Sequence, residues 1–166
     1  TGLAGEAGLE LPRPDPQFER SAKERLGLYD ALEAAARRGD RILAVLNQDS
    51  LTGKSDQDAA QGRRTHVVAY STEEGRALAH LIERLHDALD IGLHLSLVHK
   101  ERVNDDDGMF IQAGFRTTVM NVGSFPYADS QYHLEGDRPE RVDIDNLVRS
   151  TRLVLAAVLA LDADGE

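Results

Sequence analysis

Asp49 occupies a position from which a side chain can take part in chemistry. It follows residues 42–46, an unbroken apolar run whose length and lack of alternation are typical of a strand covered on both faces of a sheet. The sequence therefore predicts a central strand with Asp49 just past its carboxyl end, the edge of an open α/β sheet where ligands and metals collect. The alternative is that Asp49 only caps the turn formed with Thr52 and Gly53.

A second group of reactive side chains lies in a loop predicted over residues 124–140. This segment is too long for a simple turn, and it holds Tyr132 and His133 among several carboxylates. Long ordered loops in compact domains are usually functional. The loop is therefore a candidate functional segment.

Three consecutive aspartates, Asp105, Asp106 and Asp107, form a further candidate site. Carboxylates at this spacing could bind a hard cation such as calcium. They also fit the first turn of a short helix that ends at Gly114, because negative side chains are favourable at a helix amino terminus. We favour the helix start over the cation site.

The composition narrows the classes of partner. The formal net charge of −10 argues against a nucleic-acid partner, because phosphate binding needs a basic face. No apolar run approaches the roughly 20 residues that a membrane span requires. The chain has no cysteine, so disulfides are excluded. A sequence that begins Thr-Gly-Leu-Ala is expected to be a trimmed or processed piece of a longer protein.

Helices and strands alternate along the chain, which predicts an α/β domain. Residues 1–14, rich in glycine and proline, are interpreted as a loop before a single domain over residues 15–166. We expect a three-layer α/β/α sandwich around a mostly parallel or mixed sheet. Helices are predicted at residues 15–38, 71–89, 104–114 and 143–161, and strands at residues 42–46, 66–70, 93–99 and 117–123.

The final helix is apolar nearly all round between residues 153 and 161. This pattern predicts a deeply packed helix that is too short to span a bilayer. Leu155 and Val158 are expected to lie under the sheet. On that expectation, truncating Leu155 to alanine costs about 2–5 kcal/mol of stability.

Three segments, in order, resemble the M28 zinc peptidases. Residues 42–53 resemble the family's apolar strand that ends Asn-x-Asp-Met-x-Gly, and residues 106–115 stand where the family has Ser-Asp-His, an aromatic residue and Ala-Gly. Residues 132–143 are similar to the family's Tyr-His-Thr-x-x-Asp-Thr-x-x-x-Val-Asp, again followed by a long helix. The resemblance covers residues 41–161 and implies the carboxyl-terminal half of a peptidase domain, so the sandwich is expected to be incomplete in this chain.

The resemblance implies a site with two zinc ions that activates water to cleave an amino-terminal residue or short peptide. It makes Asp49 and His133 ligands of different zinc ions, Tyr132 a group that stabilises the oxyanion, and Glu6 a further ligand. Carboxylate oxygen and imidazole nitrogen are both ligands that zinc accepts. The substrate pocket implied by the resemblance contains Asp107, Phe110 and Phe115.

Departures from the family pattern bear on activity. Gly5 stands where the family has the general base that takes a proton from metal-bound water, and Asp107 replaces the family's histidine. The family's first histidine ligand and bridging aspartate lie upstream of this sequence. We therefore expect a partial metal site that depends on the missing amino-terminal half of the domain. The resemblance favours a secreted or periplasmic protein.

Two other functions compete with this interpretation. One is a catalytically inactive M28-like domain that binds or scaffolds other molecules. The other is a plain α/β domain in which Asp49 and His133 never meet.

Overall fold

The computed structural model describes residues 30–31, 34–35, 37–103 and 105–163. The chain divides into two compact units, residues 1–41 and residues 42–166. In the first unit, the described residues before Gly39 are helical, and Gly39 has a φ of 74°. The predicted helix end at Gly39 is thus confirmed. The loop predicted over residues 1–14 and the helix start at Asp15 lie outside the described residues, and the boundary between them stays a prediction.

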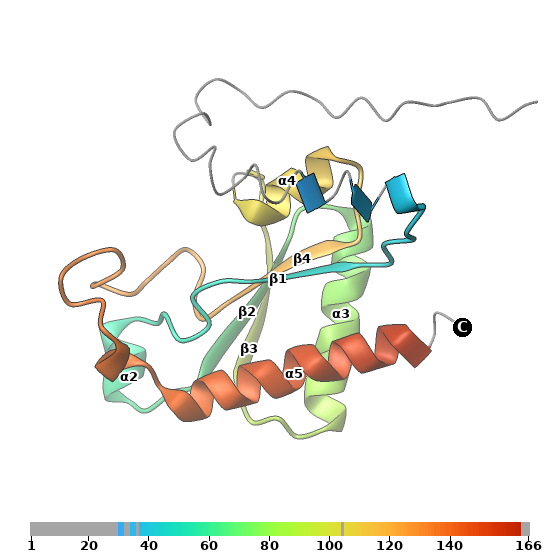
Figure 1. The fold of residues 1–166 in the computed structure, drawn as a ribbon. Coiled ribbons are helices and arrows are strands. Elements are labelled where there is room, and N and C mark those ends of the chain that lie inside the picture. Colours follow the sequence, from blue (N-terminus) through green and yellow to red (C-terminus); the bar gives the residue numbers. More distant parts are fainter. Residues whose placement is uncertain (1–29, 32–33, 36, 104, 164–166) are drawn as a thin grey trace, which may run out of the picture. The chain divides into compact units, whose positions relative to one another are not determined.

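The second unit is built on a four-stranded mixed sheet (Figure 1). Its strands are β1 (Val45–Gln48), β2 (Thr65–Tyr70), β3 (His94–His99) and β4 (Thr118–Val122), in the order β1-β4-β2-β3. The β1–β4 and β2–β3 pairs are parallel, whereas β2 and β4 are antiparallel. The predicted α/β class with a mixed sheet is confirmed, and so is the position of β3 at a sheet edge.

The strand β1 lies at the other edge, so the prediction of a central strand over residues 42–46 is wrong for this sheet. Among the described strands, β1 pairs only with β4. Its residues are half-buried or exposed, and Leu43 just before it is 42% exposed. The central, fully buried strand is β4, because β1 and β2 flank it on both sides.

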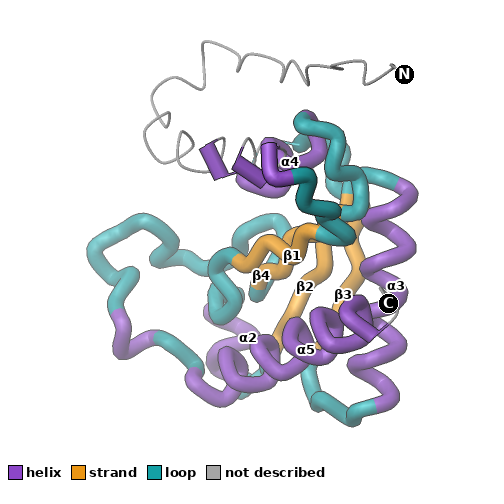
Figure 2. The backbone as a smooth tube through the Cα atoms, turned by 45° about the vertical axis from the view of Figure 1, so that its right-hand side comes forward, coloured by secondary structure: helices purple, strands orange, loops and turns teal. Residues whose placement is uncertain are grey.

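Helices α3 (Glu73–Ala88) and α5 (Ile144–Ala163) pack on one face of the sheet (Figure 2). Thr72 caps α3, since its side chain accepts a hydrogen bond from the N–H of Gly75 at 2.9 Å. The main core lies between these helices and the sheet. It contains Val68, Leu78, Ala79, Ile82, Ile91, Leu93, Val119, Leu153 and Ala157.

The opposite side of the sheet, here called the second face, carries a smaller apolar cluster of Val67, Ala69, Met120 and Val122. Phe125 and Tyr127, from the loop after β4, pack against this cluster. The remaining elements are short: α2 (Asp56–Ala60), α4 (Asp106–Gln112) and the 3-10 helix η2 (Pro139–Arg141). Within the described residues, no helix is long and apolar enough to cross a membrane.

The prediction that α5 is packed on all sides is wrong. Leu153 is fully buried, but Leu155 is 54% exposed and Val158 is also exposed. The reason is geometric: the described residues contact α5 on one side only, through α3 and the sheet. An apolar side chain on the other side of the helix therefore lies on the surface, whatever its hydropathy.

This exposure changes the expected cost of truncation. Leu153→Ala is expected to lower the free energy of unfolding by about 2–5 kcal/mol, because it leaves a cavity in the main core. Leu155→Ala is expected to cost less than about 0.5 kcal/mol, because its side chain is already in solvent. Urea unfolding followed by circular dichroism measures both. Equal losses for the two variants would show that another part of the protein covers the outer side of α5.

Candidate active site

Asp49 follows β1 directly, at the carboxyl ends of the parallel strands β1 and β4. Its N–H donates to the carbonyl of Asn121 at 3.0 Å, and the Ser50 hydroxyl donates to its Oδ1 at 3.0 Å. The carbonyl of Ser50 accepts from the N–H groups of Gly53 and Gly123 at 2.8 and 3.0 Å. Asp49 is thus held at the edge of the sheet that its sequence position predicts.

The turn after Asp49 packs tightly against the end of β4. A Cβ added to Gly123 would collide with the backbone of Gly53, and one added to Gly53 would lie 3.2 Å from the carbonyl oxygen of Ser50. The two backbones can approach this closely because both positions are glycine. This contact fixes the turn of Asp49 relative to the loop that follows β4.

That loop brings Tyr127 onto Asp49. The Tyr127 hydroxyl lies 3.0 Å from Oδ2 of Asp49 and 3.2 Å from Oδ2 of Asp105. Burial and the two negative charges raise the pKa of Tyr127 far above its ordinary value, so it stays a neutral donor. A hydroxyl has one proton, so it donates fully to one carboxylate at a time. Neither Tyr127 nor Asp105 was assigned to the site from the sequence.

A stack of three rings leads from Tyr127 to His133. The rings of Tyr127 and Tyr132 lie 4.8 Å apart and nearly parallel, and those of Tyr132 and His133 lie 4.0 Å apart. Burial, followed by the charge of Asp49, raises the pKa of Tyr132. His133 is exposed and has a φ of 60°. Its backbone N–H donates to Oδ2 of Asp137 at 3.3 Å. The stack therefore runs from Tyr127, which contacts Asp49, through Tyr132 to His133 at its other end.

The structure does not show the expected metal site in the part of the chain that it describes. Within residues 30–163, apart from the few positions left out, no group of three or more His, Asp or Glu side chains is placed to hold a metal ion. The expected ligands among the described residues, Asp49 and His133, would be two, whereas zinc sites use three or four from the protein. Glu6, the third expected ligand, lies outside the described residues. The zinc roles of all three residues stay predictions.

The sequence model of peptidase family M28 matches residues 18–158, a span that includes the whole sheet and the ring stack. The chain belongs to peptidase family M28. Searches of curated proteins and of solved structures each found no match. The mixed four-stranded sheet with its helices is consistent with an M28 peptidase domain.

In this M28 domain, the three aspartates of residues 105–107 have different roles. Asp105 stands at the N-cap position of α4 but makes no side-chain cap bond, and its carboxylate contacts Tyr127 instead. Asp106 begins the helix, as the sequence predicts. Asp107 is 1% exposed, and its Oδ1 lies 3.0 Å from Nζ of the equally buried Lys100.

The predicted substrate-pocket residues of the M28 domain lie in and just after α4. The rings of Phe110 and Phe115 meet edge to face, with centroids 6.5 Å apart. The carboxylate of Asp107 is occupied by its buried ion pair with Lys100. Nothing in this packing tests whether the three residues contact a substrate, so that role stays a prediction.

Proposed function

We propose that this M28 domain forms part of a zinc-dependent exopeptidase that removes an amino-terminal residue or short peptide. In this proposal, Asp49 and His133 are ligands of two different zinc ions, which supply an activated water when bound. The observation that supports the proposal most is the ring stack, which has Asp49 hydrogen-bonded to Tyr127 at one end and His133 at the other end.

The tyrosines have distinct tasks in this proposal. The Tyr127 hydroxyl donates a hydrogen bond to Asp49 and so fixes the orientation of the carboxylate. Tyr132 stays protonated at neutral pH, since its pKa is raised, and a protonated phenol can donate to the oxyanion that forms during peptide hydrolysis. A neutral donor beside a negatively charged transition state is favourable without any proton transfer from the tyrosine.

We further propose that this chain forms the carboxyl-terminal half of the domain, and that an amino-terminal half supplies the general base and the remaining ligands. Among the described strands, β1 pairs with β4 alone, and the apolar run of residues 42–46 has the pattern of a strand covered on both faces, which supports this partner. Isolated sheet edges usually carry charges or bulges against unwanted pairing. The exposed apolar side of α5 is a second surface that such a partner would cover. Secretion or a periplasmic location is proposed from the family resemblance alone.

A catalytically inactive binding or scaffolding domain is the second candidate. One observation favours it: Asp107, where the family resemblance has a histidine, is tied to Lys100 inside the protein and is closed to solvent. A carboxylate that is buried in an ion pair cannot take the role that the family's histidine has at this position. A measurement of peptidase activity therefore distinguishes the exopeptidase from the inactive binding or scaffolding domain.

The test measures hydrolysis of amino-acid anilides in the presence of added zinc. The chain alone is expected to be inactive, whereas the chain joined to the polypeptide encoded upstream is expected to hydrolyse them and to lose activity with Asp49→Ala. Hydrolysis by this chain alone would contradict the need for a partner. An inactive longer protein that still binds zinc would favour the scaffolding function.

A further inference from the structure

Four polar side chains are completely buried between α5 and the sheet. They are His66 from β2, Asn121 from β4, and Asn146 and Ser150 from α5, each 0% exposed. We call these four residues the polar cluster. Burial of polar groups is unfavourable unless each group finds a hydrogen-bond partner, so a cluster of four in a protein core calls for an explanation.

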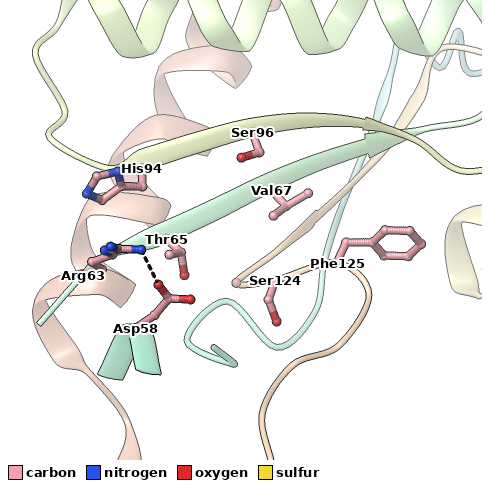
Figure 3. A pocket seen from close by; sticks show the side chains of 9 residues that line it. Asp58, Arg63, Thr65, Val67, His94, Ser96, Ser124 and Phe125 are labelled. Atoms are coloured by element: carbon pink, nitrogen blue, oxygen red, sulfur yellow. Dashed lines mark hydrogen bonds and ion pairs between the residues drawn. The ribbon is translucent and has the colours of Figure 1, made fainter. Parts of the chain in front are cut away.

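The alternation of side chains along β2 places His66 on the side of α5. Its neighbours Thr65 and Val67 line a pocket on the second face of the sheet (Figure 3). Because successive side chains of a strand point to opposite faces, His66 points the other way. There its Nδ1 lies 3.0 Å from the hydroxyl of Ser150, on the face of α5 that packs on the sheet.

The polar cluster forms one continuous line of hydrogen bonds. Asn146 donates to the Ser150 hydroxyl at 3.3 Å, and at the other ring nitrogen Nε2 of His66 lies 3.1 Å from Oδ1 of Asn121. Asn146 also binds the N–H and the carbonyl of Thr65, at 2.9 and 3.0 Å. Every side-chain nitrogen and oxygen of the four residues thus has a partner, and a buried network that is fully satisfied is rigid.

Both ends of the polar cluster bind the backbone that carries Asp49. Asn121 donates its side-chain amide to the carbonyl of Asn47 at 3.1 Å, and Asn146 donates to the carbonyl of Leu51 at 3.3 Å. The Asn146 amide has two protons for three acceptors, so its bond to Leu51 is the weaker of the two. Asn47 precedes Asp49 by two residues and Leu51 follows it by two. The cluster therefore closes a ring of bonds around the segment with Asp49 at its middle.

Apolar side chains at these four positions would fill the core but could not bind the two carbonyls. Replacing a buried polar group and its partner by apolar groups of similar shape can be nearly neutral for stability. The Asp49 carboxylate itself contacts Ser50 and Tyr127 rather than the polar cluster. The effect of the cluster on Asp49 therefore passes through the backbone.

We propose that the polar cluster positions Asp49, by holding the backbone of residues 47–51 so that the carboxylate stays on Tyr127 and faces the expected zinc site. Its four members are positioning residues and do not touch the reacting atoms. The link to zinc rests on the proposed function, whereas the hold on the Asp49 backbone does not depend on a metal.

Amide hydrogen exchange, followed by NMR of the ¹⁵N-labelled chain, tests the hold on Asp49 without zinc. The double variant His66→Leu with Asn121→Ala keeps the summed side-chain volume about constant and removes the bond to Asn47. The amide protons of Asp49 and Gly53 are expected to exchange roughly tenfold faster relative to that of Ile82, in the core of α3. A cluster that only stabilises the fold would change all three rates alike, and that result would overturn the proposal.

Thr118→Val is the matched control on the same strand. Thr118 is also 0% exposed, and its hydroxyl donates to the carbonyl of Phe115 at 2.6 Å, at the end of β4 away from Asp49. Its loss is expected to leave the ratio of the Asp49 and Ile82 exchange rates unchanged. If the double variant does not fold, the unmodified chain decides: Asp49 is expected to exchange within about tenfold of Ile82, and exchange as fast as in an unstructured peptide would overturn the proposal.

A zinc titration of the same samples separates this inference from the proposed function. Where zinc shifts the Asp49 signals of the unmodified chain, the double variant is expected to bind zinc about tenfold more weakly and Thr118→Val equally well. Equal zinc affinity of the double variant would overturn the link between the polar cluster and the metal. No zinc-dependent shift at Asp49 in the unmodified chain would contradict the proposed function, and the exchange rates would still decide whether the cluster holds Asp49.

Discussion

Replacing Lys100 with methionine is expected to lower the free energy of unfolding by about 3–5 kcal/mol. Lys100 is 3% exposed, and its Nζ lies 3.0 Å from Oδ1 of Asp107 and 3.4 Å from the sulfur of Met120. The variant removes one charge and leaves the other buried. The desolvated carboxylate then has no counterion, and this loss is far larger than that of an apolar contact. Chemical unfolding at neutral pH measures it.

Two controls show whether the buried charge is the cause. Lys100→Met combined with Asp107→Leu removes both charges, so much of the lost stability is expected to return. Arg76→Met breaks the exposed pair with Glu73 and is expected to cost less than about 1 kcal/mol. A loss below about 1 kcal/mol for Lys100→Met alone would mean that water reaches Asp107.

The stability of the protein is expected to fall by about 3 kcal/mol between pH 6.5 and pH 4 because of His66 alone. Burial lowers the pKa of His66 from 6.5 to about 4, so the folded protein keeps this ring neutral. In this range the unfolded chain binds a proton that the folded protein does not bind. The contribution is therefore fully present above pH 6.5 and is lost as the pH falls towards 4. Each pH unit costs about 1.4 kcal/mol.

The hydrogen bonds of His66 determine which of its ring nitrogens has the proton. Asn121 donates its amide to the carbonyl of Asn47 at 3.1 Å, so its Oδ1 faces Nε2 of His66, also at 3.1 Å. Nε2 therefore has the proton, and Nδ1 accepts from the Ser150 hydroxyl at 3.0 Å. A second proton on Nδ1 would require the Ser150 hydroxyl, which also accepts from Asn146 at 3.3 Å, to turn and accept from the ring instead of donating to it.

Unfolding experiments at several pH values isolate this effect. The difference in stability between the protein and its His66→Phe variant is expected to shrink as the pH falls from 6.5 to 4. Other carboxylates contribute to acid unfolding in both proteins and cancel in the difference. His80→Ala, at an exposed position on α3, is expected to follow the unmodified protein at every pH. A constant difference between the protein and His66→Phe would contradict a depressed pKa for His66.

Local patterns were sufficient to predict most elements and the place of Asp49. The start of α3 and the β-branched run of β4 depend on residues within a short stretch of chain, so the sequence predicts both elements directly. The edge position of β1 and the exposed side of α5 were missed. An apolar pattern indicates that burial of a surface is favourable, but it does not indicate which part of the protein covers that surface.

The site was harder to predict than the fold because its contacts are long-range. Tyr127 reaches Asp49 across 78 residues and Asp105 across 22 residues. No spacing in the sequence encodes such contacts, although the length of the loop made residues 124–140 a candidate functional segment.

The most direct test of the proposed peptidase site is the zinc-dependent shift in melting temperature of this chain. Two ligands bind zinc weakly, so a small shift is expected at high zinc concentration. His133→Ala and Asp49→Ala are each expected to abolish that shift, while the exposed His80→Ala leaves it unchanged. A zinc-dependent shift that survives in both His133→Ala and Asp49→Ala would contradict the assignment of these residues as ligands.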